Sequence, residues 1–478
     1  MPSTMDKLPQ ELWDAIFAEL LFDHMAALCR VNKAMRPMAH SSLYRNVVLD
    51  LDENNLIAPR AGRLLRTLLE NPTYAAQVKR FTVRAQSVRT QSSSQRNERT
   101  PLAHPTPLTD ELKKKIEGTI DEAEIYDAAL WKAALCHEQN AWAQSAFIVS
   151  RLPKLETLTV DLPLSCPLTS FFSNMLQHSA LRAVPTSKWS WLNKVSCVRL
   201  GETHIKTFDR RYYERDPDVD YSISSRLVLL ALSLPSLTEF ELWGRVDLND
   251  SVDAYSSVTA GRLNKLNLQR TNLHPTVLDA ILRENEHLES LSCAYAVPST
   301  QLPLRLDDVQ QALSHTSATL RQLSFRFNPY NDDEDVDEMF VIESGTLGSF
   351  RHFTKLTEIE LSLCVLFGQT DPDLTPPLDH VLPPNLEHLV ITDDLWGMKP
   401  FFEWGAHQYI RKFSELLQEN RNDASACDNA KARLRNITFD FLSGSFWAMD
   451  GWGEETFAEL RRICSSQNRQ CIVLVETE

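Results

Sequence analysis

One short phrase of residues recurs from Leu152 onward, and this repetition limits the folds that the chain can adopt. Each copy has an apolar anchor, a polar spacer and then alternating apolar and polar residues, the pattern of a short strand with one buried face. The strand centres of the nine copies are Leu158, Val198, Phe240, Leu266, Leu291, Leu323, Ile359, Leu389 and Ile437. Helix-like stretches such as 276–283 and 306–313 lie between them. This order of strand, crossover helix and strand predicts an α/β solenoid with parallel strands.

The unit that begins at Leu263 carries the phrase in its clearest form. Its apolar positions, Leu263, Leu266, Leu268 and Leu273, resemble those of a leucine-rich repeat. The Asn position of that family falls on Thr271, and Asn272 follows one place later. The resemblance implies an irregular leucine-rich-repeat-like solenoid over residues 109–478, with a helical entry segment and a C-terminal cap. A non-repeating α/β domain with leucine-rich strands is the alternative.

The first fifty residues have a different, helical pattern. Pro9 suits the first turn of a helix, and Leu12, Ile16 and Leu20 follow at helical spacing. We expect a second short helix capped by Asp23, and a third that starts late or is kinked by Pro37. Three short helices cannot bury all of this apolar surface among themselves. Part of it must therefore contact either the rest of the chain or another protein.

Three short motifs mark this segment: Leu8-Pro9-x-Glu11-Leu12, Val31-Asn32-Lys33 and the closing Leu43-Tyr44-Arg45. Together they closely resemble an F-box, in the form found in fungi. The segment departs from the usual pattern at Met25, Asn32 and Pro37.

The F-box resemblance implies a three-helix unit over residues 1–50 that docks on the Skp adaptor and, through it, on a cullin-RING ubiquitin ligase. Carried over position by position, it assigns a bracing role to Lys33, Arg36, Leu43 and Tyr44. The adaptor-binding residues that it implies are Leu8, Pro9, Leu12, Ile16, Leu20, Leu28 and Val31.

Local sequence patterns predict the elements that connect and follow these two regions. Residues 51–85 hold a connecting helix and the first strands, and strand-like runs at 46–49 and 78–83 look isolated. Residues 86–108 are rich in Ser, Arg and Pro, which predicts a disordered linker or loop. A helical run from 109 to about 150 is expected to break near Gly118, and 471–475 to form a final buried strand. Aromatic residues after 395 either cap the last repeat, which we favour, or grip a partner.

Composition narrows the class of protein. The net charge of 49 − 64 = −15 argues against binding to nucleic acid. Nine cysteines without a Cys-x-x-Cys pair suit a reducing compartment. The longest apolar run, 227–234, is too short to span a bilayer, and charges at Asp6, Lys7 and Glu11 do not suit a signal peptide. We therefore expect a soluble intracellular protein, in the cytoplasm or nucleus, that binds no membrane.

No catalytic signature is visible. The chain lacks a Gly-x-Ser-x-Gly elbow, a phosphate-binding loop, a His-Glu-x-x-His motif and kinase motifs. Its histidines are not in metal-binding spacing with cysteine, and the acidic run 331–338 lacks the pattern of a calcium loop. We expect no catalytic, cofactor-binding or metal site, and hence a non-catalytic subunit.

The two resemblances together imply a substrate-recognition adaptor of a Skp–cullin–F-box (SCF) ubiquitin ligase. Several outward-facing strand positions are glutamates, which suggests a basic or hydroxyl-rich protein target. Two alternatives are a scaffold that binds the Skp adaptor without cullin, and an enzyme whose catalytic site is scattered in the sequence. The predicted target-binding residues are Glu239, Glu241, Asn267, Gln269, Glu358 and Glu360.

Overall fold

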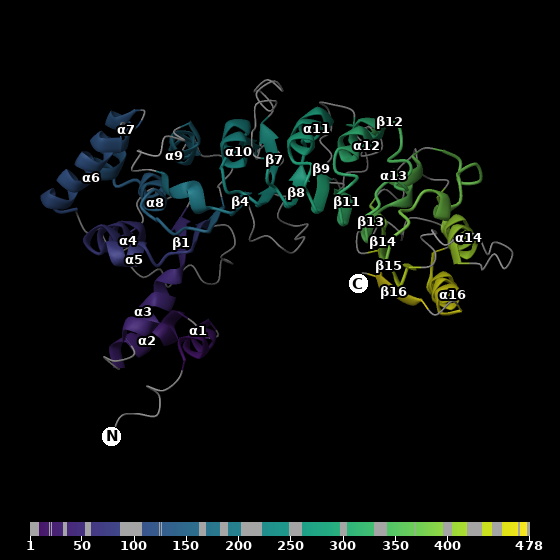
Figure 1. The fold of residues 1–478 in the computed structure, drawn as a ribbon, viewed down its shortest axis with the longest axis horizontal. Helices are drawn as coiled ribbons and strands as arrows, with labels where there is room; N and C mark the ends of the chain where they lie inside the picture. Colours follow the sequence, from purple (N-terminus) through teal and green to yellow (C-terminus); the bar gives the residue numbers. More distant parts are fainter. Residues whose placement is uncertain are drawn as a thin grey trace, which may run out of the picture. The chain divides into compact units, whose positions relative to one another are not determined.

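The computed structural model describes two compact α/β units, residues Met1–Leu237 and Thr238–Glu478. Each unit contains a parallel sheet with helices between most of its consecutive strands (Figure 1). The large parallel sheet predicted from the repeated phrase is therefore present. The described residues are 9–18, 20, 22–31, 36–52, 59–86, 108–123, 125, 127–161, 169–181, 190–201, 222–247, 261–296, 304–328, 342–368, 370–394, 404–417, 433–441, 452–466 and 469–475.

The first unit begins with three helices, α1 (Gln10–Ala18), α2 (Phe22–Val31) and α3 (Arg36–Arg45). Trp13, Phe17 and Ala39 form a small buried cluster between them. Pro37 is the second residue of α3, so this helix starts late, where a missing N–H is tolerated. The prediction that Asp23 caps α2 is wrong, because the helix already begins at Phe22.

Four parallel strands follow in the first unit: β1 (Asn46–Asp52), β2 (Arg80–Gln86), β3 (Thr157–Val160) and β4 (Cys197–Gly201). Val47, Phe81, Leu158 and Val198 are directly opposite one another across them. The strand-like runs near 46–49 and 78–83 are therefore not isolated. They are the first two strands of the sheet, which starts about a hundred residues before the first recognisable phrase.

Helices cover the strands of the first unit. The helix α6 (Asp110–Ala123) runs through Gly118 without a break, contrary to the prediction. A single Gly costs a helix only about 1 kcal/mol, and the buried stripe of Leu112, Ile116 and Ile120 outweighs this. The remaining elements are α4 (Pro59–Glu70), α5 (Pro72–Ala75), α6 (Asp110–Ala123), α7 (Ala128–Lys132), a π-helical turn (Ala133–His137), α8 (Ala141–Val149), α9 (Thr169–Leu181), a 3-10 turn (Ser190–Lys194), β5 (Ser222–Ser224) and α10 (Ser225–Leu232).

The second unit has eight parallel strands in the order β6-β8-β9-β11-β13-β14-β15-β16. Seven predicted strand centres lie directly opposite one another and are buried: Phe240, Leu266, Leu291, Leu323, Ile359, Leu389 and Ile437. The strands are β6 (Glu239–Trp243), β8 (Lys265–Thr271), β9 (Ser290–Ala296), β11 (Gln322–Asn328), β13 (Glu358–Leu361), β14 (His388–Thr392), β15 (Asn436–Phe441) and β16 (Gln470–Val475).

The last strand, β16, lies at the end of this sheet and pairs with β15. Ile472 and Leu474 are exposed, so the prediction of a buried final strand is wrong. The run of apolar residues could not distinguish the two cases, because burial depends on whether a further strand follows. Here β16 is an edge strand.

Two helices of the second unit were predicted from the sequence, and both are present. The predicted helices at 276–283 and 306–313 correspond to α11 (Pro275–Glu284) and α12 (Leu306–Ser314), which lie side by side in Figure 1. The other elements are β7 (Arg245–Asp247), the paired short strands β10 (Leu304–Arg305) and β12 (Ile342–Ser344), α13 (Leu363–Phe367), a 3-10 turn (Leu378–His380), α14 (Ala406–Leu417) and α16 (Glu454–Ser465).

Aromatic side chains pack around the C-terminal strands. Trp404 and Tyr409 are buried, and Trp404 stacks on Phe367 with 5.3 Å between ring centroids. Trp452 packs edge-on against Tyr409 and Phe441. These described aromatic residues therefore belong to the interior, as the cap interpretation expects; Trp396, Phe401, Phe402, Phe446 and Trp447 lie outside the described residues.

Two asparagine side chains accept hydrogen bonds from backbone N–H groups more than twenty residues earlier in the chain. Asn272 Oδ1 accepts a hydrogen bond from Val246 N at 2.8 Å. Asn272 therefore binds a backbone N–H although it lies one place after Thr271, the expected Asn position of the repeat. Asn285 is buried, and its Oδ1 accepts from Leu263 N at 3.0 Å while its Nδ2 donates to Ile281 O at 2.8 Å. Buried N–H groups that would otherwise lack a partner are paired in this way.

Replacing Asn285 by Ala should lower the free energy of unfolding by about 1–3 kcal/mol, because Leu263 N would be left buried and unpaired. Urea unfolding of the full chain measures this loss. Asn264→Ala is the control: that side chain is exposed, and its removal should change stability by less than about 0.5 kcal/mol. Equal losses for both variants would contradict the assignment.

Candidate functional site

Helix α1 carries apolar side chains on two sides. Trp13 and Phe17 are buried in the three-helix cluster, with 5.4 Å between their ring centroids. Leu12 and Ile16 remain 50% and 43% exposed. They are four residues apart and so share one face of the helix. We call Leu12 and Ile16 the α1 apolar pair.

The other predicted adaptor-binding residues fall into three groups. Pro9 is exposed and lies on the same stripe as the α1 apolar pair, three residues before Leu12. Leu20 and Leu28 are partly buried and pack against the cluster of Trp13, Phe17 and Ala39. Leu8 and the side chain of Val31 lie outside the described residues. The structure therefore brings Pro9, Leu12 and Ile16 together.

The three helices are attached firmly to the sheet of the first unit. The last residue of α3, Arg45, is followed directly by β1, and Arg45 O accepts a hydrogen bond from Lys79 N at 3.0 Å. The ring of Tyr44 stacks on Tyr74 with 4.7 Å between centroids. Leu43 is half-buried, Arg36 is exposed, and Lys33 lies outside the described residues.

The predicted target-binding residues all lie on the partly exposed face of the second unit's sheet. Register places Glu241 opposite Asn267, and Trp243 opposite Gln269, on the adjacent strands β6 and β8. Glu358 and Glu360 are on β13, four strand steps or about 19 Å from β6. The six residues therefore form two separate groups on one face.

Side-chain hydrogen bonds hold the first of these groups in place. Trp243 Nε1 donates to Glu241 Oε1. Gln269 Nε2 donates to Asn267 Oδ1 at 2.6 Å and to Ser292 Oγ, on β9, at 2.9 Å. The result is an ordered polar surface across three strands with one aromatic ring at its end.

The second group belongs to a cluster that the sequence did not reveal. Arg326, on β11, forms ion pairs of 3.1 Å with Glu360, 3.2 Å with Asp440 and 3.5 Å with Asp394. Asp394 Oδ2 also accepts from Phe327 N at 3.0 Å. The short strand β13 pairs with β11 only as far as Phe325. Beyond that point, the carboxylate of Asp394 accepts the hydrogen bond from Phe327 N in place of a strand partner. We call Arg326, Glu360, Asp394 and Asp440 the strand-face cluster.

The strand-face cluster is partly shielded from water. Burial lowers the pKa of Arg326, but its three carboxylate neighbours raise that pKa by more, so it stays above its usual value. Burial raises the pKa of Asp394 above its usual value, against the opposing effects of Arg326 and of the Phe327 N–H. With three carboxyl groups around one guanidinium, the ionised cluster carries a net charge of −2, which favours a cationic partner.

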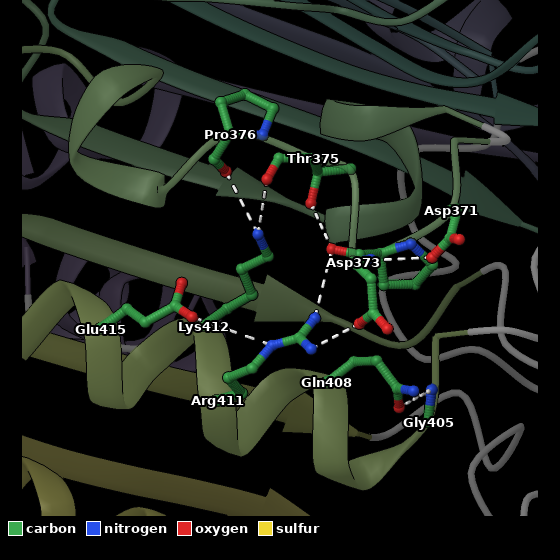
Figure 2. Close-up of polar contacts among 10 residues, drawn as sticks. Asp371, Asp373, Thr375, Pro376, Gly405, Gln408, Arg411, Lys412 and Glu415 are labelled. Carbon is green, nitrogen blue, oxygen red and sulfur yellow. Dashed lines mark hydrogen bonds and ion pairs between the residues drawn. The ribbon is translucent and has the colours of Figure 1, made fainter.

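A pair of cations on α14, Arg411 and Lys412, is by contrast fully engaged (Figure 2). Lys412 is buried, and its Nζ donates to Thr375 O at 2.8 Å and to Pro376 O at 3.3 Å. Burial lowers the pKa of Lys412.

Arg411 completes the attachment of the same loop. Its guanidinium donates to Pro372 O at 3.3 Å and contacts the carboxylates of Asp373 and Glu415. Both cations thus anchor residues 372–376 to α14. We therefore read this cluster as part of the scaffold.

Within the described ranges, no group of three or more His, Cys, Asp or Glu residues could hold a metal ion. No helix in those ranges is both long and apolar enough to cross a bilayer.

A comparison with known protein families finds no family model that matches the chain, and no curated protein matches it significantly.

Some of these residues were accessible to sequence reasoning and others were not. Arg326 and Asp440 occupy outward positions of the alternating phrase, so a strict count of alternate residues in every strand would have selected them. Asp394 follows the end of β14 and is 68 positions from Arg326, and no local pattern links the two. Only the folded sheet brings them together.

Replacing Arg326 by Gln should destabilise the protein by about 3–5 kcal/mol, because Asp394 would be left buried without a counter-ion. Urea unfolding of the full chain measures the loss. Adding Asp394→Asn should restore part of it, since the uncompensated charge is then removed.

Arg435→Gln is the matched control for Arg326→Gln. Arg435 is exposed and lies 3.7 Å from Glu387, so its loss should cost no more than about 1 kcal/mol. A loss for Arg326→Gln as small as that of the control would show that the cluster does not depend on its arginine.

Proposed function

We propose that this chain is the substrate-recognition adaptor of a Skp–cullin–F-box ubiquitin ligase. In this proposal α1, α2 and α3 are an F-box-like unit that binds the Skp adaptor. The parallel sheet of the second unit is an irregular leucine-rich-repeat-like array that binds a protein target.

The α1 apolar pair carries this proposal. If Leu12 and Ile16 were packed against the chain's own strands, no apolar surface would be left on α1 for an adaptor. Both are instead about half exposed, while their neighbours Trp13 and Phe17 fill the three-helix cluster. Both side chains are already about half buried, so covering the rest in an interface would contribute about 1.5–3 kcal/mol.

The attachment of the helices supports a role in positioning. Arg45 leads directly into β1, and the stack of Tyr44 on Tyr74 ties α3 to α5. These contacts hold the adaptor-binding helices on the first unit. The rate of ubiquitin transfer would then come from the effective concentration of a target lysine, with no catalytic group supplied by this chain.

The target surface in this proposal is the polar face of the second unit. Its ordered group of Glu241, Asn267 and Gln269 offers hydrogen-bonding groups, and the strand-face cluster offers excess negative charge. These properties suit a basic or hydroxyl-rich segment.

The double variant Leu12→Asp with Ile16→Asp should weaken binding of the purified Skp adaptor by about 100-fold or more, since it removes the burial of two apolar side chains. Titration calorimetry with the full-length chain measures the change. The full chain is required because β1 pairs with β2 and β2 pairs with β3, so an N-terminal deletion would remove strands from the sheet.

Leu130→Asp with Leu374→Asp is the matched control. These leucines are 43% and 77% exposed outside the α1 surface, and the variant adds the same two charges. It should bind the adaptor as the native chain does. Undiminished binding by Leu12→Asp with Ile16→Asp would refute the proposed docking surface.

Recovery of cullin distinguishes a ligase adaptor from a scaffold that uses the Skp adaptor alone. We expect purified cullin to join the chain only when the Skp adaptor is present, and to be lost in Leu12→Asp with Ile16→Asp. Adaptor binding without cullin, at concentrations where a known receptor recruits it, would favour the scaffold. Size-exclusion chromatography of the mixtures gives the answer.

A further inference from the structure

Two thiols meet at the C-terminal end of the second unit. Cys464 is in the last turn of α16, on the buried side of the helix that also carries Leu460. Cys471 lies on β16 directly opposite Ile437, whose side chain is buried, so both residues point to the layer between the sheet and the helix. The helix α16 packs against β16, so the two cysteines lie on facing sides of this layer.

The chain between Cys464 and Cys471 turns back toward α16. Arg469 N donates a hydrogen bond to Cys464 O at 3.1 Å, which returns the chain toward the helix just before β16 starts. Cys464 is buried, whereas Cys471 is partly exposed on the edge strand. A small oxidant can therefore reach Cys471 first, with Cys464 behind it.

The electrostatic surroundings give the two sulfurs different characters. The hydrogen bond from Cys464 lowers the pKa of Cys471, burial opposes this, and the charge of Arg461 lowers it further. The pKa of Cys464 is raised by the same hydrogen bond and by burial. A partly exposed thiol with a lowered pKa beside a second thiol is the arrangement of a peroxide-sensitive pair.

The other described thiols lack this combination. Burial raises the pKa of Cys293 and of Cys364 to about 12 in each case. Cys29 is partly exposed, but burial raises its pKa, and the charge of Arg36 only partly offsets this. Cys29 is therefore a natural control for Cys471.

We propose that Cys471 and Cys464 are a peroxide-oxidised pair that forms a disulfide between β16 and α16. The Cys471 thiolate attacks hydrogen peroxide, the O–O bond breaks, and one oxygen leaves as water after taking up a proton. The resulting sulfenic acid is attacked by the Cys464 sulfur, and its oxygen leaves as a second water. Two thiols lose two electrons and two protons, and one peroxide is reduced to two waters.

The disulfide would fasten an edge of the sheet. Among the described strands, β16 pairs with β15 alone, and an edge strand is the first to open. A covalent bond to α16 closes a short ring, from residue 464 to residue 471, and limits this opening. In a reducing compartment such a bond would form transiently, in response to oxidant.

Peptide mapping of the full-length chain tests the pair. The chain is treated with hydrogen peroxide, alkylated and digested with trypsin, which cleaves after Arg462 and Arg469 and so separates the two cysteines. We expect peptides 463–469 and 470–478 to be recovered joined by a disulfide, and to separate on reduction. Absence of this joined pair, or pairing of Cys471 with another chain, would overturn the proposal.

Variants assign the order of events. In Cys464→Ser, dimedone should trap a sulfenic acid at Cys471, and in Cys471→Ser no label should appear at Cys464. Cys29 should be labelled more slowly than Cys471 in both. Equal labelling of Cys29 and Cys471 would contradict the assigned reactivity, and the mapping of the native chain still decides the matter if a variant fails to fold.

Thermal unfolding gives an independent readout. Oxidation of the native chain should raise the melting temperature of the second unit by about 2–4 °C, and dithiothreitol should reverse this. Cys471→Ser should show no such rise. An unchanged or lower melting temperature after complete disulfide formation would refute the fastening of β16.

Discussion

The in-register stacking of parallel strands is the constraint on which the rest of this structure depends. In the second unit, apolar residues from successive strands lie directly opposite one another, from Leu266 on β8 to Ile437 on β15. Because side chains alternate along a strand, a shift of one residue would turn a whole buried row toward water. The row therefore sets the register, and the register in turn fixes which polar residues share the opposite face.

That opposite face acquires its properties from side chains on different strands. The strand-face cluster joins Arg326 on β11 to carboxylates that come from β13, from β15 and from the segment after β14. Burial makes each charge expensive in isolation, and their proximity offsets the cost. The cluster is at once a structural contact, through Asp394 and Phe327 N, and the source of the negative charge that the proposed target surface would use.

The three N-terminal helices bury some of their apolar side chains and leave others exposed. Trp13, Phe17 and Ala39 form the buried cluster of the three short helices, and the stack of Tyr44 on Tyr74 ties α3 to α5. Leu12 and Ile16 lie outside that cluster and remain exposed. At the other end of the chain, β16 is likewise left at an edge, and the Cys464–Cys471 contact is the feature that could secure it.

Local pattern was sufficient to predict the strand centres, the helices α11 and α12, and a helical start to the chain. Alternation with period two and helical spacing are properties of neighbouring residues, so the sequence contains them directly. Gly118 and the final strand were misjudged for the opposite reason: whether a helix continues, or a strand is buried, depends on packing by distant residues. The exposed positions of Leu12 and Ile16 were decided in the same way, since both are apolar and only the packing of Trp13 and Phe17 leaves them outside. The partners of Arg326 were decided entirely by tertiary structure, because Asp394 and Asp440 come within reach only after successive strands have stacked in register.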